Sequence, residues 1–154
     1  ITTCSQSNFD FVKSLGATHV IDYNKDDVKA KVMEITNNEG VDAWIENVSA
    51  ESGDIGYSCL SFAGEFVSIA GSSEIKGSGA RSGHIIFLGA AYKSGLVDKI
   101  SEIRYIGDEM VKLYEQGKIQ SLLTEVISFD KIRDYLLKLK ERHVKGKIVA
   151  KVQN

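Results

Sequence analysis

The 154-residue sequence contains no proline, no internal repeat and only two cysteines, Cys4 and Cys59. Two cysteines cannot build a disulfide framework, and this use of cysteine predicts a reducing, cytoplasmic setting. The net charge of −2, with acidic and basic residues interspersed, leaves no basic patch for nucleic acid or an anionic membrane. No apolar run approaches the ~20 residues that span a bilayer. We therefore expect a globular protein with no nucleic-acid and no membrane partner.

The sequence also lacks the G-x-G-x-x-G turn by which a dinucleotide-binding sheet holds a pyrophosphate. The nearest candidate is GSGARSG at residues 77–83, where Ser82 stands in place of the third glycine. This stretch precedes an expected strand, whereas a phosphate-binding turn precedes a helix. We interpret it as a mobile loop and not as a phosphate cradle.

A regular alternation of short β-branched runs and amphipathic segments fills the first half of the chain. Strands are expected at residues 1–5, 18–23, 41–48 and 64–71, and helices at about 8–15, 24–40 and 49–62. Ser7 is a candidate N-cap for the first helix and Gly16 its stop. This alternation is typical of βαβ units and predicts a parallel sheet covered on both faces.

The second half continues with longer elements. The apolar run HIIFLGAAY at residues 84–92 predicts a strand, and an apolar stripe at helical spacing predicts a long helix over about 97–116 that Gly117 ends. The tail reads as strand, helix and strand.

Four stretches resemble the medium-chain dehydrogenase/reductase superfamily. ITTCSQSNFDFVKSLGATHVIDY (residues 1–23) resembles the second strand, following helix and third strand of its coenzyme domain. VDAWIENV (41–48) resembles the fourth strand, GEFVSIAG (64–71) the fifth, and VKGKIVAKV (144–152) the end of the chain. FLGAAYKSG (87–95) is similar to the zinc-binding-dehydrogenase and quinone-oxidoreductase branches.

The resemblance implies an α/β fold in two parts. Residues 1–117 would form a partial dinucleotide-binding domain, a Rossmann-like parallel sheet without its first strand and glycine-rich turn. Residues 118–154 would form a strand-helix-strand return segment of the GroES-like substrate domain. The chain would thus be the C-terminal portion of an NAD(P)H-dependent oxidoreductase that transfers hydride to or from a carbonyl, alcohol, quinone or enone. This portion alone would be inactive, and no general acid or base is identified; the alternative is a non-catalytic dinucleotide-binding or association fragment.

The end of the first strand bears on the choice of cofactor. In NAD-preferring Rossmann domains the second strand ends in an acid that binds the ribose hydroxyls and repels a 2′-phosphate. Here the corresponding strand ends without an acid, and the resemblance implies that Ser5, Asn8 and Tyr23 contact the adenosine phosphate. Lys13 and Lys25 are the candidate cationic partners. NADP is the expected cofactor, with NAD as the alternative.

Six further residues follow later strands and are implied as cofactor neighbours by the resemblance. They are Asn47 and Val48 near the inner ribose, Ala70 and Gly71 near the nicotinamide, and Leu88 and Gly89 on its far side. Glu46, just before them, is interpreted as an acid with no catalytic part. Trp44 is expected in the core.

Cysteine and histidine residues are scattered along the chain without the short spacing of a zinc site. They are Cys4, Cys59, His19, His84 and His143. We expect no metal ligand among them. Zinc in the longer parent stays undecided, because the ligands of zinc-dependent members lie largely outside this part.

The strand order implied by the resemblance predicts how the chain associates. In the order 3-2-1-4-5-6 the first strand is central, so its absence leaves a gap between the strands at residues 1–5 and 41–48. The gap would be collapsed or filled by another segment. At the outer edge, the apolar strand at 84–92 predicts a homodimer through these residues, since an open strand edge invites pairing. The alternative is that the loop at 72–83 covers this edge.

Overall fold

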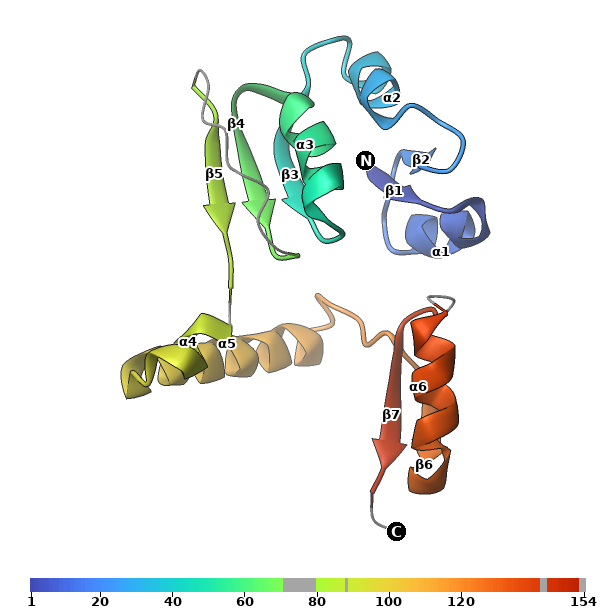
Figure 1. Ribbon diagram of the computed structural model, residues 1–154, viewed down its shortest axis with the longest axis vertical. Coiled ribbons are helices and arrows are strands. Elements are labelled where there is room, and N and C mark those ends of the chain that lie inside the picture. The colour runs from blue at the N-terminus through green and yellow to red at the C-terminus, as the bar shows by residue number, and fades with distance from the viewer. Residues whose placement is uncertain (71–79, 88, 142–143, 153–154) are drawn as a thin grey trace. The chain divides into compact units, whose positions relative to one another are not determined.

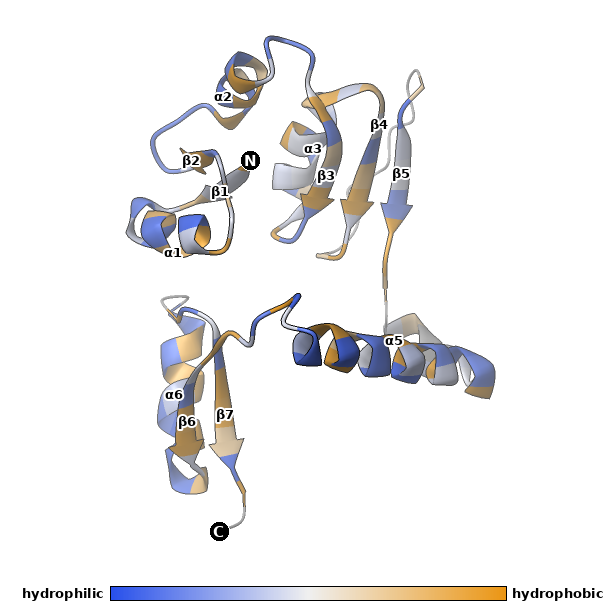
Figure 2. Ribbon diagram, turned by 180° about the vertical axis from the view of Figure 1, so that it is seen from behind, coloured by the Kyte–Doolittle hydropathy of each residue, from blue (hydrophilic) through white to orange (hydrophobic). Residues whose placement is uncertain are grey.

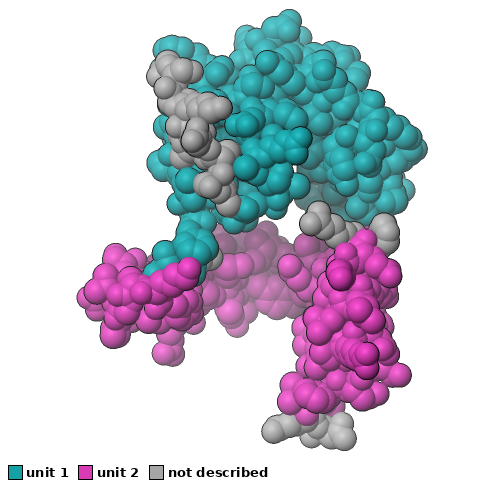
Figure 3. All heavy atoms as spheres, in the orientation of Figure 1, with its two compact units in different colours: residues 1–90 teal, residues 91–154 magenta. Residues whose placement is uncertain are grey.

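The computed structural model describes residues 1–70, 80–87, 89–141 and 144–152 (Figure 1). The chain forms two compact units, Ile1–Ala90 and Ala91–Asn154, which Figure 3 colours separately. The expected boundary after residue 117 concerns the assignment of segments to family domains and stays a prediction. Each unit is described below by itself.

The first unit alternates strands and helices along the chain. Its elements are β1 (Thr2–Cys4), the 3-10 helix η1 (Gln6–Asn8), α1 (Phe9–Ser14), β2 (Val20–Asp22), α2 (Val28–Ile35), β3 (Val41–Glu46), α3 (Ala50–Ser58), β4 (Leu60–Ser68) and β5 (Ser82–Ile85), and α4 (Gly89–Ser94) begins at its end. All strand pairings are parallel, in one sheet of order β1-β2 and a second of order β3-β4-β5. The predicted α/β fold with parallel βαβ units is confirmed.

The expected gap lies between these two sheets. Within the described residues, β1 pairs with β2 alone and β3 pairs with β4 alone, so no hydrogen-bonded ladder joins β1 to β3. The carboxyl ends of paired strands stay level, since Cys4 lies opposite Asp22 and Glu46 opposite Ser68. Residues that follow these strands are therefore gathered along one edge of each sheet.

A small hydrophobic cluster holds α2 against both sheets. Ile21 on β2, Val32 on α2 and Cys59 before β4 are almost fully buried and pack together. Partly buried side chains of Val28, Ile35, Val41 and Trp44 surround them. Trp44 therefore lies at the edge of the core, as expected, and Figure 2 shows the hydrophobic residues of these strands and helices.

Local sequence explains where the first helices begin and end. The N–H of Gly16 donates to the Lys13 carbonyl and that of Ala17 to the Val12 carbonyl, and the φ of +102° at Gly16 suits glycine. Gly16 thus ends α1 as predicted. Ser7 lies inside η1 and does not cap α1, whose cap position is Asn8, so that expectation is wrong.

The second unit contains the predicted long helix and the strand-helix-strand tail. Its elements are the remainder of α4, α5 (Val97–Glu115), β6 (Leu123–Ser128), the 3-10 helix η2 (Phe129–Lys131), α6 (Ile132–Lys140) and β7 (Lys147–Lys151). The two strands pair in parallel. Gly117, at a φ of +68°, follows α5 as expected.

The expected strand over residues 84–92 is wrong in most of its length. β5 ends at Ile85, and Gly89–Ser94 form helix α4. A short apolar run has no periodicity that separates a strand from a buried helix. The opposite error occurs at residues 60–62, expected in a helix but found in β4, which begins at Leu60 directly after α3.

Gly56 on α3 faces Trp44 so closely that a side chain has no room. A Cβ atom built there would lie 2.2 Å from the Trp44 ring. We expect Gly56→Ala to reduce the free energy of unfolding by about 1–3 kcal/mol, because overpacking outweighs the helix propensity of alanine. Urea unfolding followed by circular dichroism and by the single tryptophan measures this loss.

The matched control is Gly107→Ala in α5, where nothing lies within 4 Å of the new Cβ. Helix propensity alone then acts, and a gain of up to about 1 kcal/mol in helix stability is expected. Equal effects of the two substitutions would contradict close packing between Gly56 and Trp44.

Candidate cofactor-binding site

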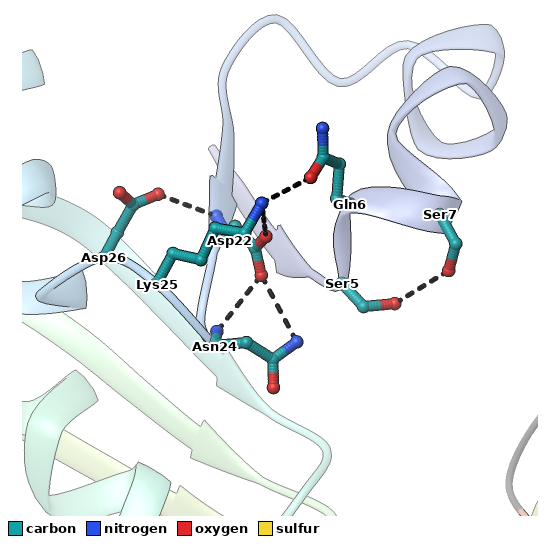
Figure 4. Close-up of polar contacts among 7 residues, drawn as sticks. All are labelled: Ser5, Gln6, Ser7, Asp22, Asn24, Lys25 and Asp26. Carbon is teal, nitrogen blue, oxygen red and sulfur yellow. Dashed lines mark hydrogen bonds and ion pairs between the residues drawn. The ribbon is translucent and has the colours of Figure 1, made fainter.

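Polar side chains gather where β1 and β2 end (Figure 4). Ser5 directly follows β1 and Tyr23 directly follows β2, and the pairing of Cys4 with Asp22 makes these two positions neighbours. Tyr23 is 57% exposed, so much of its side chain faces solvent. Two of the predicted adenosine-phosphate residues are thereby brought to one sheet edge.

Asn8, the third predicted residue, contacts Ser5. Its Nδ2 donates to Ser5 Oγ at 3.4 Å, and Ser5 Oγ lies 3.1 Å from Ser7 Oγ. The Oδ1 atom of Asn8 is buried and has no hydrogen-bond partner among the described residues. A buried acceptor without a partner is costly, so this position favours a ligand that brings a donor.

A lysine reaches the same edge from the turn after β2. Lys25 Nζ donates to Gln6 Oε1 at 2.5 Å and lies 3.9 Å from Asp22 Oδ2 (Figure 4). Its side chain remains largely exposed, so its charge is available to a ligand. Of the two candidate cations, Lys25 is thus held by Gln6, the residue next to Ser5 in the chain, while Lys13 is an exposed residue of α1.

Asp22 shapes this turn, a role that sequence reasoning missed. Its buried carboxylate accepts hydrogen bonds from the N–H of Asn24 at 3.1 Å and from Asn24 Nδ2 at 3.3 Å. The N–H of Asp22 itself donates to Asp26 Oδ2. The sequence carried a signal for this role, because an Asp at the start of a turn commonly accepts a hydrogen bond from the main-chain N–H two residues later.

A second group of predicted residues follows the carboxyl ends of β3, β4 and β5. Asn47 and Val48 follow β3, Ala70 stands two residues beyond β4, and Gly89 begins α4 after β5. Ligands of open α/β sheets bind beyond the carboxyl ends of the strands. Gly71 and Leu88 lie outside the described residues.

Glu46 organises the turn between β3 and α3. Its buried carboxylate accepts hydrogen bonds from the N–H groups of Val48 (2.6 Å) and Ser49 (3.1 Å), from Ser52 Oγ (2.7 Å) and from Trp44 Nε1 (3.2 Å). Burial opposes ionisation, but these four donors outweigh it and lower the pKa of Glu46. The carboxylate is therefore ionised, and these donors of the protein engage it; the interpretation that it has no catalytic part stays a prediction.

A cavity of 480 Å³ lies in the gap between the two sheets of the first unit. Residues of β1 and β3 line it, together with Val32 and the turn from Asn47 to Ser52. Its lining is predominantly apolar and β-branched. Glu46 and three residues that follow it, Asn47, Val48 and Ser52, belong to this lining.

Metal binding and membrane crossing can be judged over the described part of the chain. There, no three His, Cys, Asp or Glu side chains are grouped so that they could hold a metal ion. Burial and the Asp22 carboxylate raise the pKa of the Cys4 thiol, and burial raises that of Cys59, which keeps both thiols protonated. The described residues do not fit a zinc site, and no described helix is long and apolar enough to cross a bilayer.

Parallel βαβ units with polar side chains at the carboxyl ends of their strands define a Rossmann-like coenzyme-binding domain. The model of the family "Zinc-binding dehydrogenase" matches residues 15–149. The chain belongs to this family, within the medium-chain dehydrogenase/reductase superfamily. Similar solved structures include a putative NADPH:quinone reductase and an NAD-dependent alcohol dehydrogenase, which use nicotinamide cofactors.

Among curated proteins, the chain is similar to the "Probable zinc-binding oxidoreductase, mitochondrial" of Arthroderma benhamiae. The two are 28% identical over 160 residues, which cover 99% of this chain and 44% of that protein. The chain thus spans less than half the length of this curated relative.

Solved structures share the fold. An alcohol dehydrogenase superfamily protein from Novosphingobium aromaticivorans is 21% identical with a TM-score of 0.80, over 98% of this chain and 47% of that one. A quinone oxidoreductase from Pseudomonas syringae is 18% identical with a TM-score of 0.75, over 97% and 47%. An NAD-dependent alcohol dehydrogenase is 18% identical with a TM-score of 0.73, over 98% and 43%.

Because four donors bond to Glu46, we expect its substitution to lower the free energy of unfolding. Glu46→Gln keeps the size of the side chain but directs an NH₂ donor at groups that are themselves donors. We expect the free energy of unfolding at pH 7 to fall by about 1–3 kcal/mol, which is the cost of leaving buried donors unsatisfied. Chemical denaturation measures it, with Glu39→Gln at an exposed position as the control that should change stability by less than about 0.5 kcal/mol.

The same substitution has a pH signature. Because the pKa of Glu46 is lower in the folded than in the unfolded chain, its stabilisation is present above the ordinary value of 4.5 and is lost as pH falls through the folded pKa. The difference between the parent and Glu46→Gln should therefore shrink on acidification below pH 4.5. A difference that stays constant there would contradict the assignment.

Proposed function

We propose that this chain forms the C-terminal part of an NADP(H)-dependent oxidoreductase that transfers hydride to or from a carbonyl, alcohol, quinone or enone. The observation that carries the proposal is the hydrogen-bonded pair of Ser5 and Asn8 after β1, whose own end carries no acid, with Lys25 bonded to the intervening Gln6. Family membership supports the reaction class. Small-molecule substrates of the four named types suit a nicotinamide cofactor, which itself supplies the hydride chemistry.

Each residue of the cluster is proposed to bind a different group at the adenosine end of the cofactor. Ser5 Oγ and Lys25 Nζ are donors for a 2′-phosphate, with the lysine adding a charge-assisted hydrogen bond. Asn8 Oδ1, which lacks a partner among the described residues, accepts from a ribose hydroxyl or the adenine amino group. Tyr23 lies exposed beside them and offers a ring surface. An acid in place of Ser5 would instead bind the free hydroxyls of NAD, the alternative cofactor.

The residues after β3, β4 and β5 are proposed to hold the nicotinamide half. Asn47 and Val48 would contact the inner ribose, and Glu46 orients them by fixing the N–H of Val48. Ala70 and Gly71 would lie near the nicotinamide ring, with Leu88 and Gly89 on its far side. Main-chain groups and small side chains let the ring approach the strand ends closely.

The chain alone supports a second, non-catalytic reading as a dinucleotide-binding or association fragment. The observation in its favour is the open gap between β1 and β3, beside which a pyrophosphate turn would normally stand. The two functions are distinguished by assaying the chain by itself with NADPH and a panel of quinones. Turnover by the chain alone would exclude the non-catalytic fragment. We propose a cytoplasmic setting on the basis of cysteine usage.

Cofactor preference in the longer enzyme tests the proposal. NADPH should exceed NADH in kcat/KM by at least about tenfold, or ~1.4 kcal/mol. Lys25→Met should reduce this ratio on the order of tenfold by removing the cation beside the 2′-phosphate. Lys29→Met, an exposed lysine of α2, is the control that should leave it unchanged. Equal kcat/KM for the two cofactors in the parent enzyme would refute NADP as its cofactor.

We also propose a homodimer through residues 84–92. Because β5 ends at Ile85, the strand contributes only the first part of this interface. Ile85, Ile86 and Phe87 are exposed at the end of β5, which pairs with β4 alone in the described part. The N–H of Ile86 still donates to Ser68, so this apolar edge is held in extended form. An edge of this kind invites pairing with another chain.

Sedimentation equilibrium measures this association. The parent chain should be dimeric at about 100 μM, because this concentration lies well above a dissociation constant in the micromolar range. Ile86→Lys should render it monomeric, because a charge replaces an apolar contact. Leu15→Lys, at the exposed residue that follows α1, should leave the dimer intact. A monomeric parent at this concentration, or a dimer unaffected by Ile86→Lys, would exclude this interface.

A further inference from the structure

The turn after β2 places one cation among three acids. Residues 22–27 read DYNKDD, so Lys25 is the single basic residue of this turn. Each of the acids accepts a hydrogen bond from a main-chain N–H of the turn or of the first turn of α2; they are Asp22, Asp26 and Asp27. The acids therefore hold the main chain, and the direction of the Lys25 side chain decides whether an anion meets a cation here.

Lys25 lies near a neutral and a charged acceptor, and it donates to the neutral one. Its Nζ donates to Gln6 Oε1 at 2.5 Å, whereas Asp22 Oδ2 lies 3.9 Å away, which is beyond hydrogen-bond distance (Figure 4). The other carboxylate oxygen of Asp22 is engaged by Asn24. An amide does not neutralise an ammonium, and the Lys25 side chain is 64% exposed, so its positive charge stays available to a ligand.

Gln6 reaches the lysine from the neighbouring strand. It follows Ser5 in the chain and begins η1, whereas Lys25 belongs to the turn after β2, which pairs in parallel with β1. Residues 4–8 read CSQSN and include no acidic or basic side chain. The hydrogen bond thus draws the ammonium from the acidic turn toward the uncharged segment that follows β1.

From this contact we infer that Gln6 is a positioning residue for cofactor selection: by holding the Lys25 ammonium away from Asp22, it keeps this cation free for the 2′-phosphate of NADP(H). The inference rests on the proposed function, because it assigns a role within the adenosine-phosphate site. Without the amide, the ammonium would approach Asp22 and form an ion pair whose charges cancel. With an acid at position 6, the lysine would be neutralised and a further negative charge would face the phosphate.

A purely structural role of Gln6 predicts different behaviour. If its bond to Lys25 only tied the two turns together, its loss would weaken every ligand of the site alike. A role through the charge of Lys25 affects only ligands that carry a 2′-phosphate. Two probes that differ in this group separate the two roles; they are adenosine 2′,5′-bisphosphate and adenosine 5′-monophosphate.

The test measures the affinity of the 154-residue chain for both probes by nuclear magnetic resonance titration. The parent should bind the bisphosphate about tenfold more tightly, because Lys25 adds a charge-assisted hydrogen bond. Gln6→Leu should lower this ratio about threefold and Gln6→Glu at least about tenfold, while affinity for the monophosphate stays unchanged. The matched control is Gln120→Leu, at an exposed glutamine of the second unit, which should leave both affinities unchanged.

The outcomes separate this inference from the proposed function. A parent chain that does not favour the bisphosphate would count against NADP as the cofactor and would overturn the inference with it. A parent that favours the bisphosphate, together with the same ratio in Gln6→Glu, would overturn the inference alone. A loss of affinity for both probes alike in Gln6→Leu would also overturn it, since that pattern indicates a structural role.

A double-substitution cycle shows whether Gln6 acts through Lys25. In the Lys25→Met background no cation remains to be positioned, so adding Gln6→Leu should leave the affinity ratio unchanged. A further fall of the ratio in the double variant would identify Gln6 as a direct ligand of the phosphate and would overturn the positioning role. Circular dichroism of each variant confirms that the compared chains are folded.

Discussion

The packing of Val32 between Ile21 and Cys59 is the contact on which the first unit depends. Ile21 belongs to the β1-β2 sheet and Cys59 leads into β4 of the other sheet, and no strand pairing joins the two sheets in the described residues. Burial of such side chains contributes about 1.5–3 kcal/mol each. Helix α2 therefore links the two sheets through hydrophobic contacts, and Val32 also lines the cavity beside β3.

Charged and polar groups then shape the two ends of the candidate site. At the β3 end, Glu46 uses its carboxylate to hold the N–H groups of the following turn, and the same bonds lower its pKa. At the β1-β2 end, Asp22 holds its own turn and Lys25 reaches across to Gln6. In both places an acid adjacent to a strand end orients main chain, and at the β1-β2 end the exposed Lys25 cation remains to meet a ligand.

Much of the fold was predictable because the signals are local. Helix α5 was expected over 97–116 and is found at Val97–Glu115, since its apolar stripe recurs over many turns. Gly16 ends α1 because glycine adopts a positive φ at little cost. The errors fall where the signal is short: residues 84–92 carry an apolar run without periodicity, and small residues at its end form α4. Ser7 looked like a cap, but a 3-10 turn moved the helix start beyond it.

The sequence by itself determined the family, the parallel βαβ order and an acid-free end of β1, because these depend on residue types at neighbouring positions. The placement of Ser5, Asn8 and Tyr23 at one edge followed from that strand order. Only the tertiary structure decided that Lys25, and not Lys13, stands beside Gln6 nineteen residues away. It also decided that Glu46 is saturated by four donors and that β1 and β3 face one cavity. Contacts of this kind depend on how separate elements pack, and periodicity along the chain carries no information about that packing.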